Sequence, residues 1–458
     1  MKSAISLALL LVPLPMGPAT AQQVASTPPT TYQRAIAAGY KAAMICSGVF
    51  NAGRTPAQIE ADELAGIYPD YAPILPTLPP AAIDRTTHSV TVAFDDKLPP
   101  RQSDWRPGTG CTTMPIGSRV RPLFHPHAPQ PGPAAADPRP WPLGDAGIAP
   151  RPSPALASTV ANAFDDDYGE GAKTVGVVIL RDGHVVAERY SEGFGPFVAN
   201  RTWSVAKSIA GTLVGLAGMN TTSTAGIYGM PGFDSSDPRS GISVDHLLRM
   251  ASGLHSDTAG NRTDAIYFGG TAVDEQAMSW PLEAAPGARF RYANNDILLA
   301  MRAVRRSLGE ERHTFFPKAS LFLPLGMANT IAERDWHGNY ILSSQVWSTA
   351  RDLARLGQFW LQDGVWEGKR LLPAGWMAYM TAPSGPQPES GPGYGATLWL
   401  FGPKQGLPAG SYAAQGNRGQ YVMVIPSRRL VIVRRGEDPG PARFDIARFA
   451  ADVVAATQ

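Results

Sequence analysis

The hydrophobic and polar positions along the chain change period twice, and this separates a helical middle segment from strand-rich segments on either side. Between residues 204 and 390, apolar residues recur three and four positions apart, which is typical of amphipathic helices packed on a core. We therefore predict a mainly helical part over residues 204–390. Its clearest helices are SVDHLLRM (243–250), DILLAMRAVRRSL (296–308) and TARDLARLGQFWL (349–361).

Strand patterns flank the helical part. KTVGVVILRDGHVVAERY (173–190) predicts a β-hairpin, because Asp-Gly at 182–183 favours a two-residue turn. After residue 394, GATLWLF, QYVMVIP and RLVIVRRG predict further strands, and the chain closes with a helical pattern. Because the strands lie on both sides of the helical part, we expect one sheet with that part inserted into it. This α/β domain spans residues 155–458, with its sheet part at 155–203 and 391–458.

A separate pattern precedes this domain. A helical stretch over residues 30–50 is followed by HSVTVAFD, in which Val90, Val92 and Phe94 alternate with polar residues as in a half-buried strand. The pattern predicts a small N-terminal α+β unit over residues 22–121.

The segment between Pro122 and Pro154 contains too many prolines for a regular helix or a central strand. We interpret residues 122–154 as an extended connector, for which wrapping around the next domain is one arrangement. His125-Pro126-His127 is a lone histidine pair with no neighbouring carboxylate or cysteine, so it predicts no metal site.

Composition excludes some classes of function. The 458 residues are 44% hydrophobic and 17% charged with a net charge of +2, a balance that favours a large core and indicates neither nucleic acid nor an anionic membrane as partner. Residues 1–21 combine one lysine, an apolar stretch and Ala19-Thr20-Ala21, which predicts a cleaved secretory signal and a periplasmic or secreted protein. Three prolines interrupt the apolar stretch, which is too short to span a membrane.

The chain has two cysteines, Cys46 and Cys111. In an oxidising compartment such a pair favours a disulfide over a metal site, and two separate buried thiols are the alternative.

The stretch TWSVAKSIAGTLVGLA (202–217) places Ser204 and Lys207 three residues apart at a helix start, where their side chains share one face. The neighbouring residues are apolar or small, and a buried lysine kept partly neutral can take the proton of a serine. Ser208 competes for the role of nucleophile, but it points to another side of the helix.

The loop PGARFRYANNDILLA (286–300) carries a second candidate pair, Tyr292 and Asn294, before a helix expected from about Asp296. A phenol beside a lysine can relay protons, and a carboxamide can bind both the lysine and a substrate amide. The alternative is purely structural, with Asn294 or Asn295 capping the helix.

A third stretch, AAQGNRGQYVMVIP (413–426), has Gly416 and Gly419 just inside a strand. Glycine lets a backbone approach a neighbour closely, as a donor of an oxyanion hole must, although this stretch taken alone favours a glycine bulge on an edge strand.

The order and spacing of these three motifs resemble the serine β-lactamase and penicillin-binding superfamily. The surrounding residues are most similar to the branch of class C β-lactamases, family VIII-like carboxylesterases and 6-aminohexanoate-dimer hydrolases. The resemblance covers residues 155–458 and implies an antiparallel sheet flanked by helices, with a large inserted helical domain and no cofactor.

The resemblance implies Ser204 as nucleophile, Lys207 as its base and Tyr292 as proton relay. Asn294 would bind the lysine and the acyl side of a substrate. The oxyanion would be held at Gly416, by the backbone N–H groups of Ser204 and Asn417.

One departure bears on the substrate. The family carries lysine or histidine two residues before the third-motif glycine, where this chain has Ala414. Arg418 is the candidate replacement, and a solvated arginine is the simpler explanation. We therefore expect a hydrolase of small esters or amides, with a class C-like β-lactamase or a catalytically silent penicillin-binding-like receptor as alternatives.

Overall fold

We describe the protein from a computed structural model, which covers residues 28–119, 136–224, 236–256 and 263–458. The predicted signal at residues 1–21 and the pair His125 and His127 lie outside these described residues.

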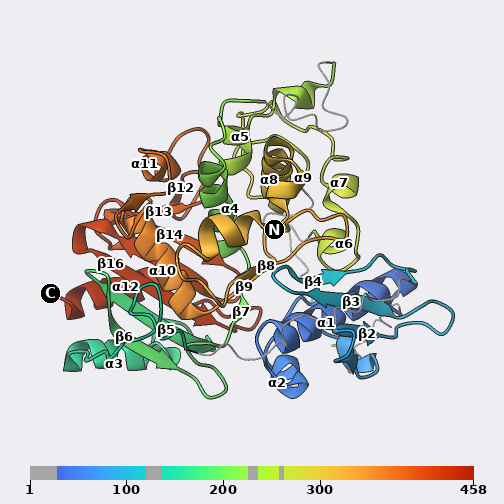
Figure 1. Ribbon diagram of the computed structural model, residues 1–458, viewed down its shortest axis with the longest axis horizontal. Coiled ribbons are helices and arrows are strands. Elements are labelled where there is room, and N and C mark those ends of the chain that lie inside the picture. Colours follow the sequence, from blue (N-terminus) through green and yellow to red (C-terminus); the bar gives the residue numbers. More distant parts are fainter. Residues whose placement is uncertain (1–27, 120–135, 225–235, 257–262) are drawn as a thin grey trace, which may run out of the picture.

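A seven-stranded antiparallel sheet lies at the centre of the larger part of the molecule (Figure 1). Its strand order is β12-β13-β14-β15-β16-β5-β6. Two of the strands precede the helical part and five follow it, so the sheet is built from both sides of that part, as the sequence predicts. The strands are β5 (Thr174–Arg181), β6 (His184–Tyr190), β12 (Gly393–Tyr394), β13 (Trp399–Phe401), β14 (Ser411–Gly416), β15 (Gln420–Ile425) and β16 (Leu430–Gly436).

The β5–β6 hairpin turns at the predicted residues. Asp182 and Gly183 both have positive φ, +53° and +81°, as a two-residue turn of the type I′ class requires.

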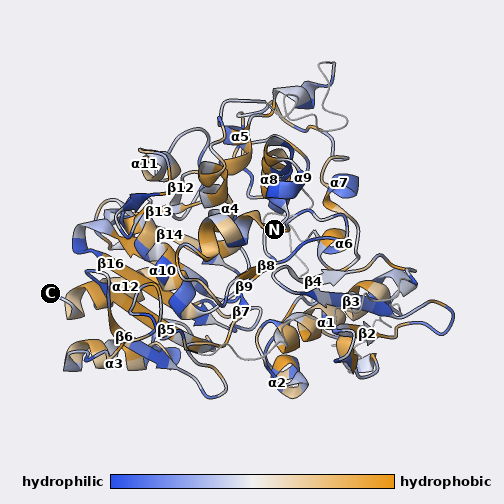
Figure 2. Cartoon of the chain, in the orientation of Figure 1, coloured by the Kyte–Doolittle hydropathy of each residue, from blue (hydrophilic) through white to orange (hydrophobic). Residues whose placement is uncertain are grey.

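Helices cover both faces of the sheet, because its strands alternate between two cores. Val178, Val424 and Val433 face the helix α10, whereas Ile179, Met423 and Ile432 face the helices α3 and α12. Figure 2 shows the apolar residues concentrated in these strands. The covering helices are α3 (Pro154–Asn162), α10 (Ala350–Leu361) and α12 (Ile446–Ala456).

The inserted part holds most of the remaining helices and a few short strands. A three-stranded sheet, ordered β7-β9-β8, joins this part to the main sheet, and its strands are too short to give a sequence pattern. The elements are α4 (Val205–Leu216), α5 (Val244–Leu248), α6 (Asp264–Tyr267), α7 (Val273–Gln276), α8 (Asn294–Leu308), α9 (Glu310–His313), α11 (Trp376–Met380), β7 (Asn200–Arg201), β8 (Ile331–Ala332), β9 (Val346–Ser348), β10 (Val365–Trp366) and β11 (Lys369–Arg370).

The N-terminal unit has the predicted α+β character. Its long helix α1 packs on a four-stranded antiparallel sheet, and the disulfide between Cys46 and Cys111 joins α1 to the strand β4, which excludes two separate thiols. Thr30 and Gln33 form a capping box at the start of α1. The elements are α1 (Thr31–Phe50), α2 (Pro56–Ala61), β1 (Ala82–Asp84), β2 (Ser89–Val92), β3 (Arg101–Arg106) and β4 (Gly110–Thr113).

The N-terminal unit is docked firmly on the inserted part through the buried carboxylate of Glu333. One oxygen of Glu333 accepts hydrogen bonds from Ser47 Oγ at 2.6 Å, Asn51 Nδ2 at 2.8 Å and the Cys111 backbone nitrogen at 3.0 Å. Burial raises the pKa of Glu333 to about 7, and these donors oppose the shift. The two units share one core, because α1 residues such as Tyr40 belong to the same cluster as Phe268.

The described residues of the connector, 136–154, lie against the main domain. Trp141 Nε1 donates to the Gly183 carbonyl at 2.7 Å, and Arg355 of α10 donates to the carbonyls of Pro142 and Gly144. Buried polar backbone is thereby satisfied without regular secondary structure.

Within the described residues, none of the helices combines the length and the apolar character that crossing a membrane requires.

Replacing both cysteines by serine (C46S/C111S) is expected to lower the free energy of unfolding by about 2–5 kcal/mol, because the crosslink spans 65 residues of the unfolded chain. Urea denaturation with and without reductant measures this. Reductant should destabilise the wild type to the level of the variant and leave the variant unchanged. A wild type that exposes two reactive thiols in urea before any reduction would contradict the disulfide.

Candidate active site

Ser204 lies at the amino-terminal end of α4, on a tight turn that leads out of β7. The Thr202 backbone nitrogen donates to the Val346 carbonyl at 2.8 Å and fixes this turn on β9. Trp203 has a φ of +50°, in the left-handed region that residues with a side chain adopt at a cost. Ser204 occupies the N-cap position but makes no side-chain capping bond, so its hydroxyl is directed to other partners.

Lys207 is buried, with 1% of its surface exposed, and no carboxylate is among its polar contacts within the described residues. Its Nζ lies 2.9 Å from Ser204 Oγ, 2.6 Å from Asn294 Oδ1 and 2.7 Å from the Ser343 carbonyl oxygen. Burial lowers the pKa of Lys207 well below its ordinary value, and the positive charge of Arg201 lowers it further. The amine is therefore neutral over a wider pH range than a surface lysine.

A neutral amine fits these three contacts well. It carries two N–H donors, which the Asn294 and Ser343 oxygens accept, and one lone pair, which then faces Ser204 Oγ. The geometry places a proton acceptor against a serine hydroxyl, as nucleophilic catalysis requires.

Tyr292 completes the cluster from the opposite side. Its ring centre lies 5.0 Å from Lys207 Nζ, and its hydroxyl shares a hydrogen bond with Ser204. Burial raises the pKa of Tyr292, so the phenol keeps its proton when Lys207 has lost its own. Trp399 and Tyr394 pack against the ring at centroid distances of 5.5 and 6.1 Å and fix its orientation.

Asn294 is the first residue of α8, which begins two residues earlier than the sequence pattern indicates. The capping alternative is wrong: Ala293 occupies the N-cap position, and there is no side-chain capping bond. The carboxamide of Asn294 instead accepts the hydrogen bond from Lys207. The sequence pattern places the start of α8 too late because Asn294 and Asn295 are polar. Although both are buried, they do not extend the apolar periodicity of the helix.

Gly416 ends β14 beside the serine. A Cβ atom on this glycine would lie 2.3 Å from the Thr202 carbonyl oxygen and 3.1 Å from the Ser204 nitrogen, so only glycine allows this approach. β14 lies between β13 and β15 and pairs with β15 in regular register, so the pattern is not an edge-strand bulge. Asn417 follows Gly416 directly, and its side chain is exposed.

Two competing assignments are excluded by burial. Ser208 is buried and donates its hydroxyl to the Thr397 carbonyl. The expectation of a solvated Arg418 is wrong, because only 8% of its surface is exposed. Its guanidinium donates to the carbonyls of Glu437, Asp438 and Glu63 and forms an ion pair with Glu437 at 3.4 Å.

Sequence reasoning missed two contributors to the site. The Ser343 carbonyl that contacts Lys207 is a backbone group, and no sequence signal could reveal it. Arg201 is fully buried, lies 3.9 Å over the Trp203 ring and donates to Ser344 Oγ at 2.8 Å. The one sequence signal for Arg201 is an arginine placed three residues before the candidate nucleophile.

The chain belongs to the beta-lactamase family, because the beta-lactamase family model matches residues 160–456. It is therefore a serine hydrolase of the class that the three motifs indicated, and the resemblance inferred from them is confirmed. The 6-aminohexanoate-dimer hydrolase of Paenarthrobacter ureafaciens is 27% identical over 300 residues, which are 58% of this chain and 72% of that enzyme.

Solved structures confirm the fold. A penicillin-binding protein homologue from Caulobacter crescentus superposes with a TM-score of 0.54 at 16% identity, over 68% of this chain and 99% of that one. A family VIII carboxylesterase gives a TM-score of 0.52 at 14% identity, over 68% and 98% of the two chains.

Replacing Arg201 by glutamine removes a positive charge that opposes protonation of Lys207, so the pKa of Lys207 should rise. The acidic limb of the pH profile of kcat/KM is then expected to move to higher pH by about one pH unit. Identical midpoints in wild type and Arg201→Gln would contradict this role of the charge.

Proposed function

We propose that this serine hydrolase cleaves an ester or amide bond of a small molecule through an acyl-enzyme on Ser204. One observation carries the proposal: the buried Lys207 Nζ lies 2.9 Å from Ser204 Oγ. Lys207 has no carboxylate partner among the described residues. In enzymes, burial lowers the pKa of a lysine so that its amine is partly neutral and can accept a proton.

In the acylation step, Ser204 Oγ forms a bond to the carbonyl carbon while its proton moves to Lys207 Nζ. The electron pair of the carbonyl moves onto its oxygen. That oxyanion receives hydrogen bonds from the backbone N–H groups of Ser204 and Asn417, which lie on either side of the close contact at Gly416.

The intermediate collapses when the bond to the leaving group breaks. The leaving oxygen or nitrogen takes the proton of the Tyr292 hydroxyl, and Lys207 returns the proton that it received to the phenol. The opposite pKa shifts of the two groups suit these roles, because the amine is the better acceptor and the phenol holds its proton until it is needed. Water then releases the acyl group by the same steps in reverse order.

The charges around the site favour uncharged substrates. The position two residues before Gly416 is a buried alanine, Ala414, and the Arg418 guanidinium is engaged by Glu437 and backbone carbonyls. Neither offers a cation to a substrate carboxylate, which β-lactam antibiotics carry. Small uncharged esters and amides are therefore the proposed substrate class, and the relative named a 6-aminohexanoate-dimer hydrolase supports amide cleavage.

We also propose that the protein acts in the periplasm or the medium. The disulfide supports an oxidising environment, and the leader pattern at residues 1–21 supports export to the periplasm or the medium.

Ser204→Ala should abolish covalent labelling by a fluorophosphonate probe, because the nucleophilic oxygen is removed. Lys207→Met, which keeps the length and the burial of the side chain, should slow labelling by about a hundredfold or more. Mass spectrometry of the labelled peptide measures both. The matched control is Ser208→Ala, one turn further along α4, which should label like the wild type. A label that persists in Ser204→Ala would refute the proposed nucleophile and favour the silent receptor.

A substrate panel separates the proposed hydrolase from a class C-like β-lactamase. We expect turnover of p-nitrophenyl acetate and of a linear amide dimer, and slower turnover of a cephalosporin than of its methyl ester, because Ala414 replaces the basic residue of the third motif and Arg418 is engaged by Glu437. Steady-state kcat/KM values measure this. Fast cephalosporin turnover without any ester turnover would reverse the assignment.

A further inference from the structure

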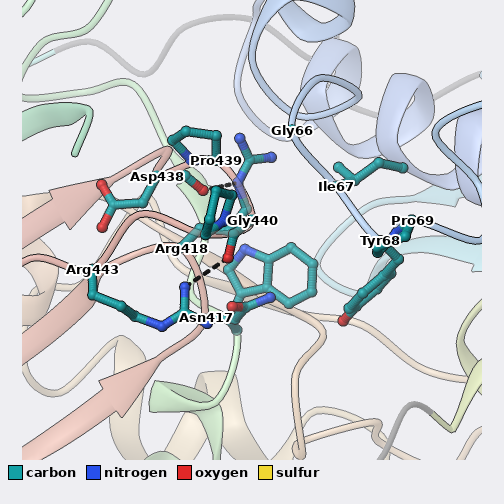
Figure 3. A pocket seen from close by; sticks show the side chains of 12 residues that line it. Gly66, Ile67, Tyr68, Pro69, Asn417, Arg418, Asp438, Pro439, Gly440 and Arg443 are labelled. Carbon is teal, nitrogen blue, oxygen red and sulfur yellow. Dashed lines mark hydrogen bonds between the residues drawn. The ribbon is translucent and has the colours of Figure 1, made fainter. Parts of the chain in front are cut away.

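A pocket of about 500 Å³ lies between the N-terminal unit and the main domain (Figure 3). Its two walls come from parts of the chain that are distant in sequence. Residues 66–69 of the N-terminal unit form one wall, and residues 417–418 and 438–443 of the main domain form the other, with Trp203 between them. Residues 66–69 lie outside the beta-lactamase family match.

The pocket lies on the side of the oxyanion donors. It is lined by Trp203, the residue before Ser204, and by Asn417, the residue after Gly416. Ser204, Lys207 and Tyr292 are not among its lining residues, so the pocket lies next to the nucleophile and away from the proton donor. The carbonyl carbon of a substrate carries two groups, the leaving group and the acyl group. Because the leaving group must face Tyr292, the acyl group is the one that can enter this pocket.

The surface of the pocket is largely apolar. Ile67, Pro69 and Pro439 contribute aliphatic walls, and the rings of Tyr68 and Trp203 meet edge to face at 6.2 Å.

The charged side chains at the pocket are engaged elsewhere or lie at its exposed edge. Arg418 is held by backbone carbonyls and Glu437, and Asp438 accepts hydrogen bonds from Arg434 at 2.7 and 2.9 Å. Arg443 is exposed and donates to the carbonyls of Gly440 and Ala442. An uncharged, ring-sized group suits such a cavity better than an ionic one.

The two walls are joined to each other, so the pocket is preformed. The Gly440 nitrogen donates to the Gly66 carbonyl at 2.9 Å, and Arg418 Nη1 donates to the Glu63 carbonyl at 3.4 Å. Gly66 has a φ of +62°, and a Cβ there would lie 2.7 Å from Pro439 Cβ, which shows how closely the walls meet.

We propose that this pocket binds the acyl group of the substrate and selects uncharged aromatic acyl groups, with the N-terminal unit supplying one of its two walls. The inference rests on the proposed acyl-enzyme function and adds the substrate class to it. It assigns to the N-terminal unit a role in specificity.

The test compares p-nitrophenyl phenylacetate with p-nitrophenyl acetate, which share a leaving group and differ in the acyl group. In the wild type kcat/KM should be about tenfold or more higher for the phenylacetate. Ile67→Trp fills the pocket from the N-terminal wall and should remove most of that preference by lowering kcat/KM for the phenylacetate.

Two further variants complete the design. Gly440→Val narrows the pocket from the opposite wall, where an added Cβ meets no atom closer than 3.7 Å, so it should fold and reproduce the loss. Ile83→Trp, a half-buried isoleucine of the same unit away from the pocket, is the matched control and should keep the wild-type preference.

The outcomes separate the two proposals. Acetate hydrolysis with no phenylacetate preference, or a preference that survives both Ile67→Trp and Gly440→Val, overturns the pocket assignment and leaves the proposed function standing. Hydrolysis of neither ester, together with no fluorophosphonate label, overturns the proposed function and the pocket assignment with it.

Discussion

The arrangement of the candidate site depends on the burial of a lysine amine without a negative charge to balance it. A charged amine in such a place costs several kcal/mol, and the chain avoids this cost by lowering the pKa of Lys207 and surrounding its Nζ with neutral oxygens. Each oxygen comes from a different segment: Ser204 from the turn before α4, Asn294 from the start of α8 and Ser343 from the loop before β9. Three segments that are distant in sequence therefore meet at one nitrogen atom.

The sheet supplies the second constraint, which is steric. Gly416 brings β14 against the backbone of Thr202 and Ser204 so closely that any side chain there would displace the turn. That turn is already fixed on β9 and holds Trp203 at positive φ. The close approach and the strained residue belong together in the proposed oxyanion hole, because a rigid turn would let the backbone N–H groups of Ser204 and Asn417 converge on one oxygen.

The N-terminal unit is packed tightly on the inserted part. Its long helix shares the core of the inserted part, and Gly39 of α1 approaches the Phe268 backbone so closely that a Cβ would lie 2.1 Å from the carbonyl oxygen. Glu333 and the disulfide fix the other side of the unit, and residues 66–69 then stand opposite the loop that follows β16. A unit joined so tightly offers a preformed wall, which costs little entropy when a ligand binds.

The sequence by itself determined the periodic and local features: the β5–β6 hairpin with its Asp182-Gly183 turn, the helices α1, α8 and α10, and the spacing of Ser204 and Lys207. These follow from side-chain period and turn chemistry, which are properties of neighbouring residues. Only the tertiary structure decided what surrounds the lysine, whether Arg418 is buried, and which segments face each other across the pocket. Those properties depend on contacts between segments up to several hundred residues apart, and in particular on backbone carbonyls, which every residue carries and no sequence pattern distinguishes.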